Sequence, residues 1–318
     1  MNFRTSNWHA AAFLTLCSLG LSATAAAADP ADTLLGEQNK TPKSGLVPLD
    51  AEPTIVTLCA SNVAAESSPP PSTAEPIEQR VTTADRPPYH GTIYVAPDIY
   101  LDSDPSAFGS LSYVGQDKRR MFDRRENRIL TKHAHLFEAK FTDGLSLEVR
   151  VNPEFTRDRA ATLARQYMAA FGQLPTELRR GMTSFSIHDG DRPFGGGGRA
   201  VFVHVGMGER YIRKGILTET LFHETVHATV DSRMARDRDW RAAQEADGVF
   251  ISTYAKANPR REDLAETLLL SIALDQRPER LPAGMAEVLR ATIPRRQAFF
   301  EKRLGWNIDP TARPANGQ

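Results

Sequence analysis

Two histidines and a glutamate stand at the spacing His-Glu-x-x-His near the middle of the chain. They are His223, Glu224 and His227, within the run Leu221–Asp231. On an α-helix, residues four apart project from the same face, so both imidazoles would lie within reach of one cation. Glu224 would point toward a water in the open coordination position and act on it as a base. The motif therefore predicts two zinc ligands and a general base.

Two histidines leave a catalytic zinc site incomplete, because such a site has three protein ligands and a water. A second pair of residues four apart, Glu262 and Glu266, begins a strongly apolar stretch further along the chain. One of these carboxylates can bind the metal while the other holds a ligand imidazole in place. Asp263 competes for the same role, but it points about 100° away from Glu262 around the helix and cannot share that face. The alternative for this pair is a solvated acidic first turn, which the helix dipole favours.

Two aspartates are further candidates for holding an imidazole. Asp231 follows His227 by four residues, and Asp247 lies on the next predicted helix. Either carboxylate is of the type that accepts the second ring N–H of a ligand histidine. Asp231 is equally compatible with an ordinary polar residue near a helix end.

Three short motifs of this region together resemble the gluzincin metallopeptidases. They are His223-Glu224-x-x-His227, Ser252-Thr253-Tyr254 and Glu262-x-x-Ala265-Glu266. The resemblance covers about residues 200–300, excludes the N-terminal half, and is strongest to the catalytic domain of anthrax lethal factor. It implies a zincin-like fold in which His223, His227 and Glu262 bind Zn²⁺. It also implies that Glu224 is the base.

The resemblance assigns a catalytic role to Tyr254 as well. In the family, a tyrosine shortly before the third ligand assists at the oxyanion, and a phenol can donate a hydrogen bond to a tetrahedral intermediate. This chain departs from the family in having one more residue between Tyr254 and Glu262. The alternative is a packed tyrosine whose hydroxyl is hydrogen-bonded within the core.

The elements that must position these residues follow from the hydrophobic pattern. Alternating apolar residues around the turn Thr142-Asp143-Gly144 predict a β-hairpin over 136–151. Thr156 is expected to cap a helix that Gly172 ends. Further strands are expected over 183–188 and 200–205, and helices at about 217–232, 239–256, 261–275 and 284–303, with Thr218 as a cap.

Strands first and helices last predict an α+β domain. A β-hairpin and mixed sheet would come first, followed by a mainly helical, zincin-like half that carries the His-Glu-x-x-His helix.

Two other patterns have open interpretations. The run Gly195–Gly198 lacks the Lys-Ser/Thr ending of a phosphate loop. It is expected to be a flexible turn, or a mobile lip beside a cleft with Ala200–Val205 as an edge strand that pairs with a peptide. His133 and His135 could bind a metal from one strand face, but a pair of exposed histidines is the favoured interpretation.

The N-terminal 88 residues differ in composition from the rest. Residues 1–28 have the pattern of a secretory signal, with Arg4, an apolar run over Ala10–Leu21 and small residues up to Ala28. Residues 29–88 contain proline clusters and no aromatic residue, which predicts a disordered tether. A zinc metallopeptidase domain is expected over 89–312 and a flexible tail over 313–318. An uncleaved membrane anchor and a pro-segment that blocks the active site are the alternatives.

Composition narrows the function further. The 318 residues carry 39 Lys and Arg against 39 Asp and Glu, so a basic nucleic-acid footprint is not the organising feature. Two cysteines cannot build a disulfide framework or a thiolate zinc cage.

The sequence thus predicts a secreted or periplasmic zinc metallopeptidase. It would act on a peptide or protein substrate, with no membrane span after signal removal. The alternatives are a zinc-dependent amidase acting on cell-wall peptides and a non-catalytic, zinc-stabilised binding domain. Oligomeric state is left open.

Overall fold

The computed structural model describes residues 86–91 and 98–311, which all belong to one compact unit of the chain. The predicted signal at 1–28, residues 29–85 of the predicted tether and the predicted tail at 313–318 lie outside the described residues. Within the described ranges, every helix is too short or too polar to cross a bilayer.

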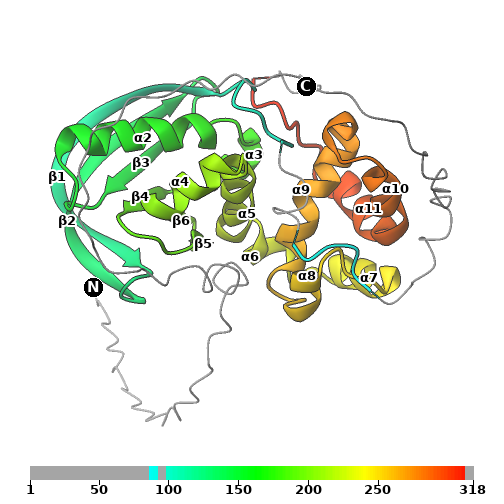
Figure 1. Cartoon of the computed structure of the whole chain (residues 1–318). Helices are drawn as coiled ribbons and strands as arrows, with labels where there is room; N and C mark the ends of the chain where they lie inside the picture. The colour runs from blue at the N-terminus through cyan, green and yellow to red at the C-terminus, as the bar shows by residue number, and fades with distance from the viewer. Residues whose placement is uncertain (1–85, 92–97, 312–318) are drawn as a thin grey trace, which may run out of the picture. The chain divides into compact units, whose positions relative to one another are not determined.

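A six-stranded mixed sheet forms the first part of the described chain (Figure 1). Its strands stand in the order β1-β2-β3-β4-β6-β5. The pairs β3–β4 and β4–β6 are parallel and the other three are antiparallel. The strands are β1 (Phe108–Asp123), β2 (Arg128–Phe141), β3 (Ser146–Val151), β4 (Ser184–His188), β5 (Gly195–Gly197) and β6 (Ala200–His204).

The predicted hairpin is the pair β2–β3. Phe137 faces Val149 and Ala139 faces Leu147, and all four side chains are buried. The alternation in the sequence therefore identified the face of each strand that is buried. The neighbouring strand β1 was not predicted, because most of its side chains are at least partly exposed and its sequence has no apolar alternation.

Helix α2 (Arg157–Phe171) covers β1, β2 and β3. The hydroxyl of Thr156 accepts a hydrogen bond from the N–H of Arg159, so the predicted cap is confirmed. The helix ends at Gly172 as predicted, although this glycine has an ordinary right-handed backbone with φ −67°. The reason for glycine is space, since a Cβ at this position would overlap the hydroxyl of Ser106.

The remaining helices lie between strands or after the last strand in the sequence. They are α3 (Thr176–Arg179), α4 (Val205–Arg213), α5 (Leu217–Thr229), α6 (Asp231–Met234), α7 (Arg238–Asp247), α8 (Thr253–Ala257), α9 (Asp263–Gln276), η3 (Pro278–Arg280), α10 (Met285–Thr292) and α11 (Pro294–Arg303). The predicted helix over 239–256 is wrong, because Gly248 at φ +68° ends α7 and a loop precedes α8. Helix α4 was not predicted.

Thr218 does not cap α5. The helix begins at Leu217 after Ile216, which makes no side-chain capping bond, and Thr218 lies inside the first turn. Its hydroxyl instead donates to the side-chain oxygen of Gln173 at 2.8 Å. The threonine therefore joins α5 to the segment after α2 and does not cap the start of its own helix.

Helix α5 connects the two parts of the fold. It contacts β5 and β6 on one side and α9 on another, and Figure 1 shows it between the sheet and the C-terminal helices. The sheet-then-helices arrangement confirms the predicted α+β class. The expected edge strand at Ala200–Val205 is wrong, because β6 lies between β4 and β5 and the glycine strand β5 forms the edge.

Candidate metal centre

Helix α5 presents His223 and His227 toward the same point. The helix is anchored by Leu221, Phe222 and Val226, whose side chains are fully buried. The Nε2 atoms of the two imidazoles lie 3.0 Å apart, and His223 is only 6% exposed. The four-residue spacing therefore places both rings on one buried face, as predicted.

Glu262, the residue that precedes α9, supplies a third group. Its Oε2 atom lies 3.3 Å from Nε2 of His223 and 3.1 Å from Nε2 of His227. Within the described part of the chain, this is the one group of at least three His, Cys, Asp or Glu residues whose ligand atoms all lie within 4.8 Å of one another. Two imidazole nitrogens and one carboxylate oxygen form the donor set of a catalytic zinc site.

The charges of the group favour a cation between the side chains. Burial by itself would lower the pKa of His227, but hydrogen bonds to Asp231 and Glu262 outweigh it and raise that pKa to about 10. Burial would raise the pKa of Glu262, but the two imidazoles hold it well below its usual range. Without a metal, the carboxylate thus draws a proton into the site, and a bound Zn²⁺ would take the place of that proton. The residues therefore fit the metal.

Each imidazole has a carboxylate behind it. Nδ1 of His227 lies 2.6 Å from Oδ2 of Asp231, so of the two interpretations left open for Asp231 the structure favours the partner of a histidine. Nδ1 of His223 lies 3.7 Å from Oε1 of Glu266, longer than a hydrogen bond, and no hydrogen-bond partner reaches this nitrogen. Carboxylates in these positions set the ring tautomer and orientation of metal-binding histidines.

Ser252 also takes part in this arrangement, although the sequence motif that contains it predicted no role for its side chain. Its hydroxyl donates to Oε2 of Glu266 at 2.8 Å and accepts from the N–H of Ala255 at 2.9 Å. The second bond makes Ser252 the N-cap of α8. A serine before a short helical pattern is a capping signal, but nothing local in the sequence points to Glu266.

Glu224 follows His223 on α5 and is only partly buried, so its side chain can reach water. Its backbone carbonyl packs against Gly196 of β5 so closely that a Cβ at Gly196 would overlap the carbonyl oxygen. Glycine at position 196 is therefore needed for a strand that lies directly on α5. A Cβ at Gly197 or Gly198 would meet open space, and Gly198 begins the turn that leads to β6.

Tyr254 lies in the first turn of α8, two residues after Ser252, and is partly buried. Its backbone N–H donates to the carbonyl oxygen of His90. The predicted role of its hydroxyl at an oxyanion stays a prediction.

Two aspartates that competed for site roles belong to a different network. Asp247 and Asp263 both contact the fully buried guanidinium of Arg296, at 2.8 Å and 2.7 Å. Asp263 also accepts from the side-chain amide of Gln244 at 2.7 Å. The proposal that Asp247 supports a ligand histidine is therefore wrong. Asp263 points away from the metal group, as the helical geometry predicted.

The histidine pair of β2 belongs to no group of three possible metal ligands among the described residues. His133 is exposed as expected, but His135 is buried, with Nε2 3.0 Å from the carbonyl oxygen of Phe155. A second cluster that the sequence did not reveal contains the fully buried His188 and His204, each 3.6 Å from the carboxylate of Asp123. Burial lowers the pKa of His188 to about 4 and holds the pKa of His204 below its usual value.

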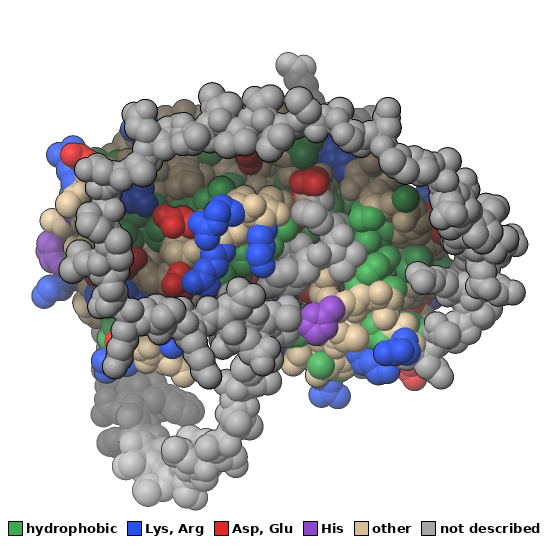
Figure 2. Space-filling view, viewed as in Figure 1, with side chains coloured by type: hydrophobic (Ala, Val, Ile, Leu, Met, Phe, Trp, Pro, Cys, Tyr) green, Lys and Arg blue, Asp and Glu red, His purple; other side chains and the backbone are tan. Residues whose placement is uncertain are grey.

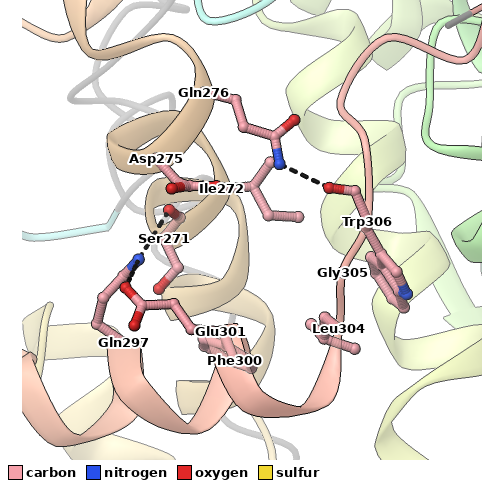
Figure 3. Close-up of a pocket in the computed structure, with 10 residues that line it drawn as sticks. All are labelled: Ser271, Ile272, Asp275, Gln276, Gln297, Phe300, Glu301, Leu304, Gly305 and Trp306. Atoms are coloured by element: carbon pink, nitrogen blue, oxygen red, sulfur yellow. Dashed lines mark hydrogen bonds between the residues drawn. The ribbon is translucent and has the colours of Figure 1, made fainter. Parts of the chain in front are cut away.

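Two surface features lie apart from the metal group. Figure 2 shows Lys and Arg side chains gathered over the region of α4, where Arg213 and Lys214 are exposed and Arg210 pairs with Asp191 at 3.1 Å. A cavity of about 180 Å³ opens between α9, α11 and the segment 304–306, with Gln276 donating to the carbonyl of Trp306 (Figure 3). None of the candidate metal ligands lines this cavity.

Comparisons with protein-family models, with curated proteins and with solved structures found no match to this chain.

Proposed function

We propose that the protein is an exported zinc metallopeptidase, a gluzincin-like hydrolase that cleaves peptide bonds. The observation that carries the proposal is the meeting of His223, His227 and Glu262 around one point. Glu224 lies beside the first of these ligands on the same helix. Three ligands with an adjacent, partly exposed carboxylate make up the apparatus for metal-assisted hydrolysis.

Each residue has a defined task in this proposal. Zn²⁺ bound there would polarise the scissile carbonyl and lower the pKa of a water molecule. Glu224 removes a proton from the attacking water and delivers it to the leaving amine. Tyr254 donates a hydrogen bond to the developing oxyanion. Asp231 holds His227 through its Nδ1 atom, and Glu266 lies 3.7 Å behind Nδ1 of His223, with the Nε2 atoms of both rings turned inward.

The edge strand β5 supports a peptide as the substrate. Among the described residues, β5 pairs with β6 on one side only, so its other side offers backbone groups to an extended chain. The same strand packs on α5 at Glu224. A peptide added to this edge would therefore run close to the base.

The proposed location outside the cytoplasm rests on the signal-like residues 1–28. They combine a basic start, a short apolar run and a small-residue cleavage region. We propose that the mature chain acts in the periplasm or in the medium.

The test is a peptide-library digestion by the purified full chain, with zinc and with a chelator. We expect cleavage that the chelator abolishes and added zinc restores. A cell-wall peptide fragment is included as a second substrate, because its hydrolysis without any library cleavage would identify an amidase instead. Zinc binding at one equivalent with no hydrolysis of either substrate would identify a non-catalytic binding domain and overturn the proposal.

A further inference from the structure

Helix α8 is held at its start by a distant part of the chain. The helix has only five residues, too few to be stable without contacts at its ends. The N–H of Thr253 donates to the carbonyl of Tyr89 at 2.8 Å, and the N–H of Tyr254 donates to the carbonyl of His90 at 3.1 Å. With Ser252 capping the next N–H, the first three donors of the helix all have acceptors.

The contact with residues 89–90 has the form of a parallel strand bridge. Tyr89 pairs with Ser252 in this way, 163 residues away along the chain. The hydroxyl of Thr253 adds a side-chain contact, 2.9 Å from Nδ1 and 3.1 Å from the carbonyl oxygen of His90. Two backbone bonds and one side chain thus fix the turn that begins at Ser252.

The same turn leads to a proposed zinc ligand. Ser252 is fully buried and donates to Glu266, whose other carboxylate oxygen lies 3.7 Å from Nδ1 of His223. Glu266 and His223 are themselves at most 6% exposed. A continuous path therefore runs from the partly buried Tyr89 and the exposed His90 to Ser252, Glu266 and His223, and its last three residues are buried.

We propose that Tyr89 and His90 are positioning residues of the metal centre. They fix the first turn of α8. The Ser252 hydroxyl at the start of this turn then keeps Glu266 behind His223, and the carboxylate orients the imidazole for Zn²⁺. Without them, water would replace two fixed acceptors, and the hydroxyl and carboxylate would take several orientations. The inference rests on the proposed function, since it assigns control of that same zinc site to an N-terminal segment.

The experiment measures the zinc dissociation constant of full-length variants by competition with a chelator. Deleting Tyr89–Gly91 removes both carbonyl acceptors, and deleting Ser68–Pro70 is the control of equal length. We expect the first deletion to weaken zinc binding by about 10–100-fold, as changes behind metal ligands do, and the second to leave it unchanged. Ser252→Ala should match the first deletion, because it breaks the same path one step later.

A point substitution tests the same contact without removing any residue from the chain. Thr253→Val removes the contacts with His90 at nearly constant shape, while Thr253→Ser keeps the hydroxyl. We expect Thr253→Val to weaken zinc binding by a few-fold, on the scale of about 1 kcal/mol for a lost hydrogen bond, and Thr253→Ser to bind normally. The melting temperature of each metal-free variant shows whether it is folded.

The outcomes separate this inference from the proposed function. A folded deletion variant and a Thr253→Val variant that both bind zinc normally would overturn the inference and leave the function standing. A fall in melting temperature with unchanged zinc affinity would show a merely structural segment and also overturn it. If the unaltered chain binds no zinc, the proposed function fails and the inference fails with it.

Discussion

Nδ1 of His227 lies 2.6 Å from Oδ2 of Asp231, although the two residues belong to different helices. Helix α5 ends at Thr229 and α6 begins at Asp231, so Val230 alone separates them. The chain therefore stays close to helical, and the four-residue spacing brings the carboxylate under the imidazole. Nε2 of His227 is left to face His223 and Glu262.

This contact predicts that Asp231→Asn weakens zinc binding by about 10–100-fold. The neutral amide cannot stabilise the ring N–H as a carboxylate does, so the imidazole becomes a weaker and less oriented ligand. Chelator competition gives the affinity. Asp158→Asn, on the exposed first turn of α2, is the control. Equal zinc affinity in the two variants would show that Asp231 is an ordinary polar residue at a helix end.

Glu224→Gln is expected to abolish hydrolysis while leaving zinc bound. The amide keeps the shape of the side chain but cannot accept the proton of the attacking water. Metal analysis beside a peptide-cleavage assay checks both parts of the prediction. Retained activity would rule out Glu224 as the base, and lost zinc would mean that it is a ligand.

Glu262→Ala should lose zinc almost completely, because Oε2 of Glu262 lies within 3.3 Å of both ligand nitrogens. Glu266→Ala should weaken zinc binding by about 10–100-fold, since it removes the carboxylate behind His223. Chelator competition ranks the two variants. The reverse ranking would exchange the roles of the two carboxylates.

Asp263 is the internal control for these two glutamates. It contacts Arg296 and Gln244 instead of the histidines, so Asp263→Asn should keep zinc binding. It should lower the free energy of unfolding by about 1–3 kcal/mol, because the buried guanidinium keeps Asp247 but loses one of its two charged partners. Urea denaturation measures this loss. A zinc affinity lower than that of Glu262→Ala would overturn the ligand assignment.

Glu219 lies one turn before His223 and is 1% exposed, and burial raises its pKa to about 7 from 4.5. The unfolded chain therefore releases this proton at a lower pH than the folded chain. The contribution of Glu219 to the free energy of unfolding is therefore fully present below pH 4.5. It is lost as the pH rises to about 7, and the loss is about 3 kcal/mol.

Glu219→Gln should remove that loss, because the amide stays neutral and its oxygen can still accept the N–H of Tyr100. The variant should gain stability relative to the unaltered protein between pH 4.5 and pH 7. Urea denaturation of the metal-free proteins at about pH 4.5 and pH 8 measures it. Glu209→Gln, on the exposed side of α4, should show no such gain. Parallel pH profiles for Glu219→Gln and the unaltered protein would contradict the prediction.

A chain that begins at Arg86 should melt at the temperature of the full chain. Residues 29–85 contain no aromatic side chain and several proline clusters, so they lack the material for a core. The start lies before Tyr89 and His90, whose carbonyls hold α8. Differential scanning calorimetry compares the two chains. A lower melting temperature would mean that residues before Arg86 pack on the domain.

The meeting of His223 and His227 could be predicted because helical spacing alone brings the two side chains together, and the same rule paired Glu262 with Glu266. The contact between Ser252 and Glu266 could not, since it depends on how α8 and α9 pack. Asp263 was correctly separated from the site by its angle around the helix, but its partner Arg296 is 33 residues away. Strand β1 was missed because an exposed strand lacks the alternation that reveals the hairpin. Local periodicity therefore predicted which residues meet within one element, but not the contacts that form when separate elements pack.

At Gly196 and the carbonyl of Glu224, the backbones of β5 and α5 are in direct contact, with no side chain between them. Where side chains separate two elements, a change of rotamer or residue size can adjust the gap. Here there is no such layer to adjust. The height of the sheet edge above α5 at this point is therefore set by the main chain alone. If β5 binds peptides as proposed, that height would be the same for every one of them.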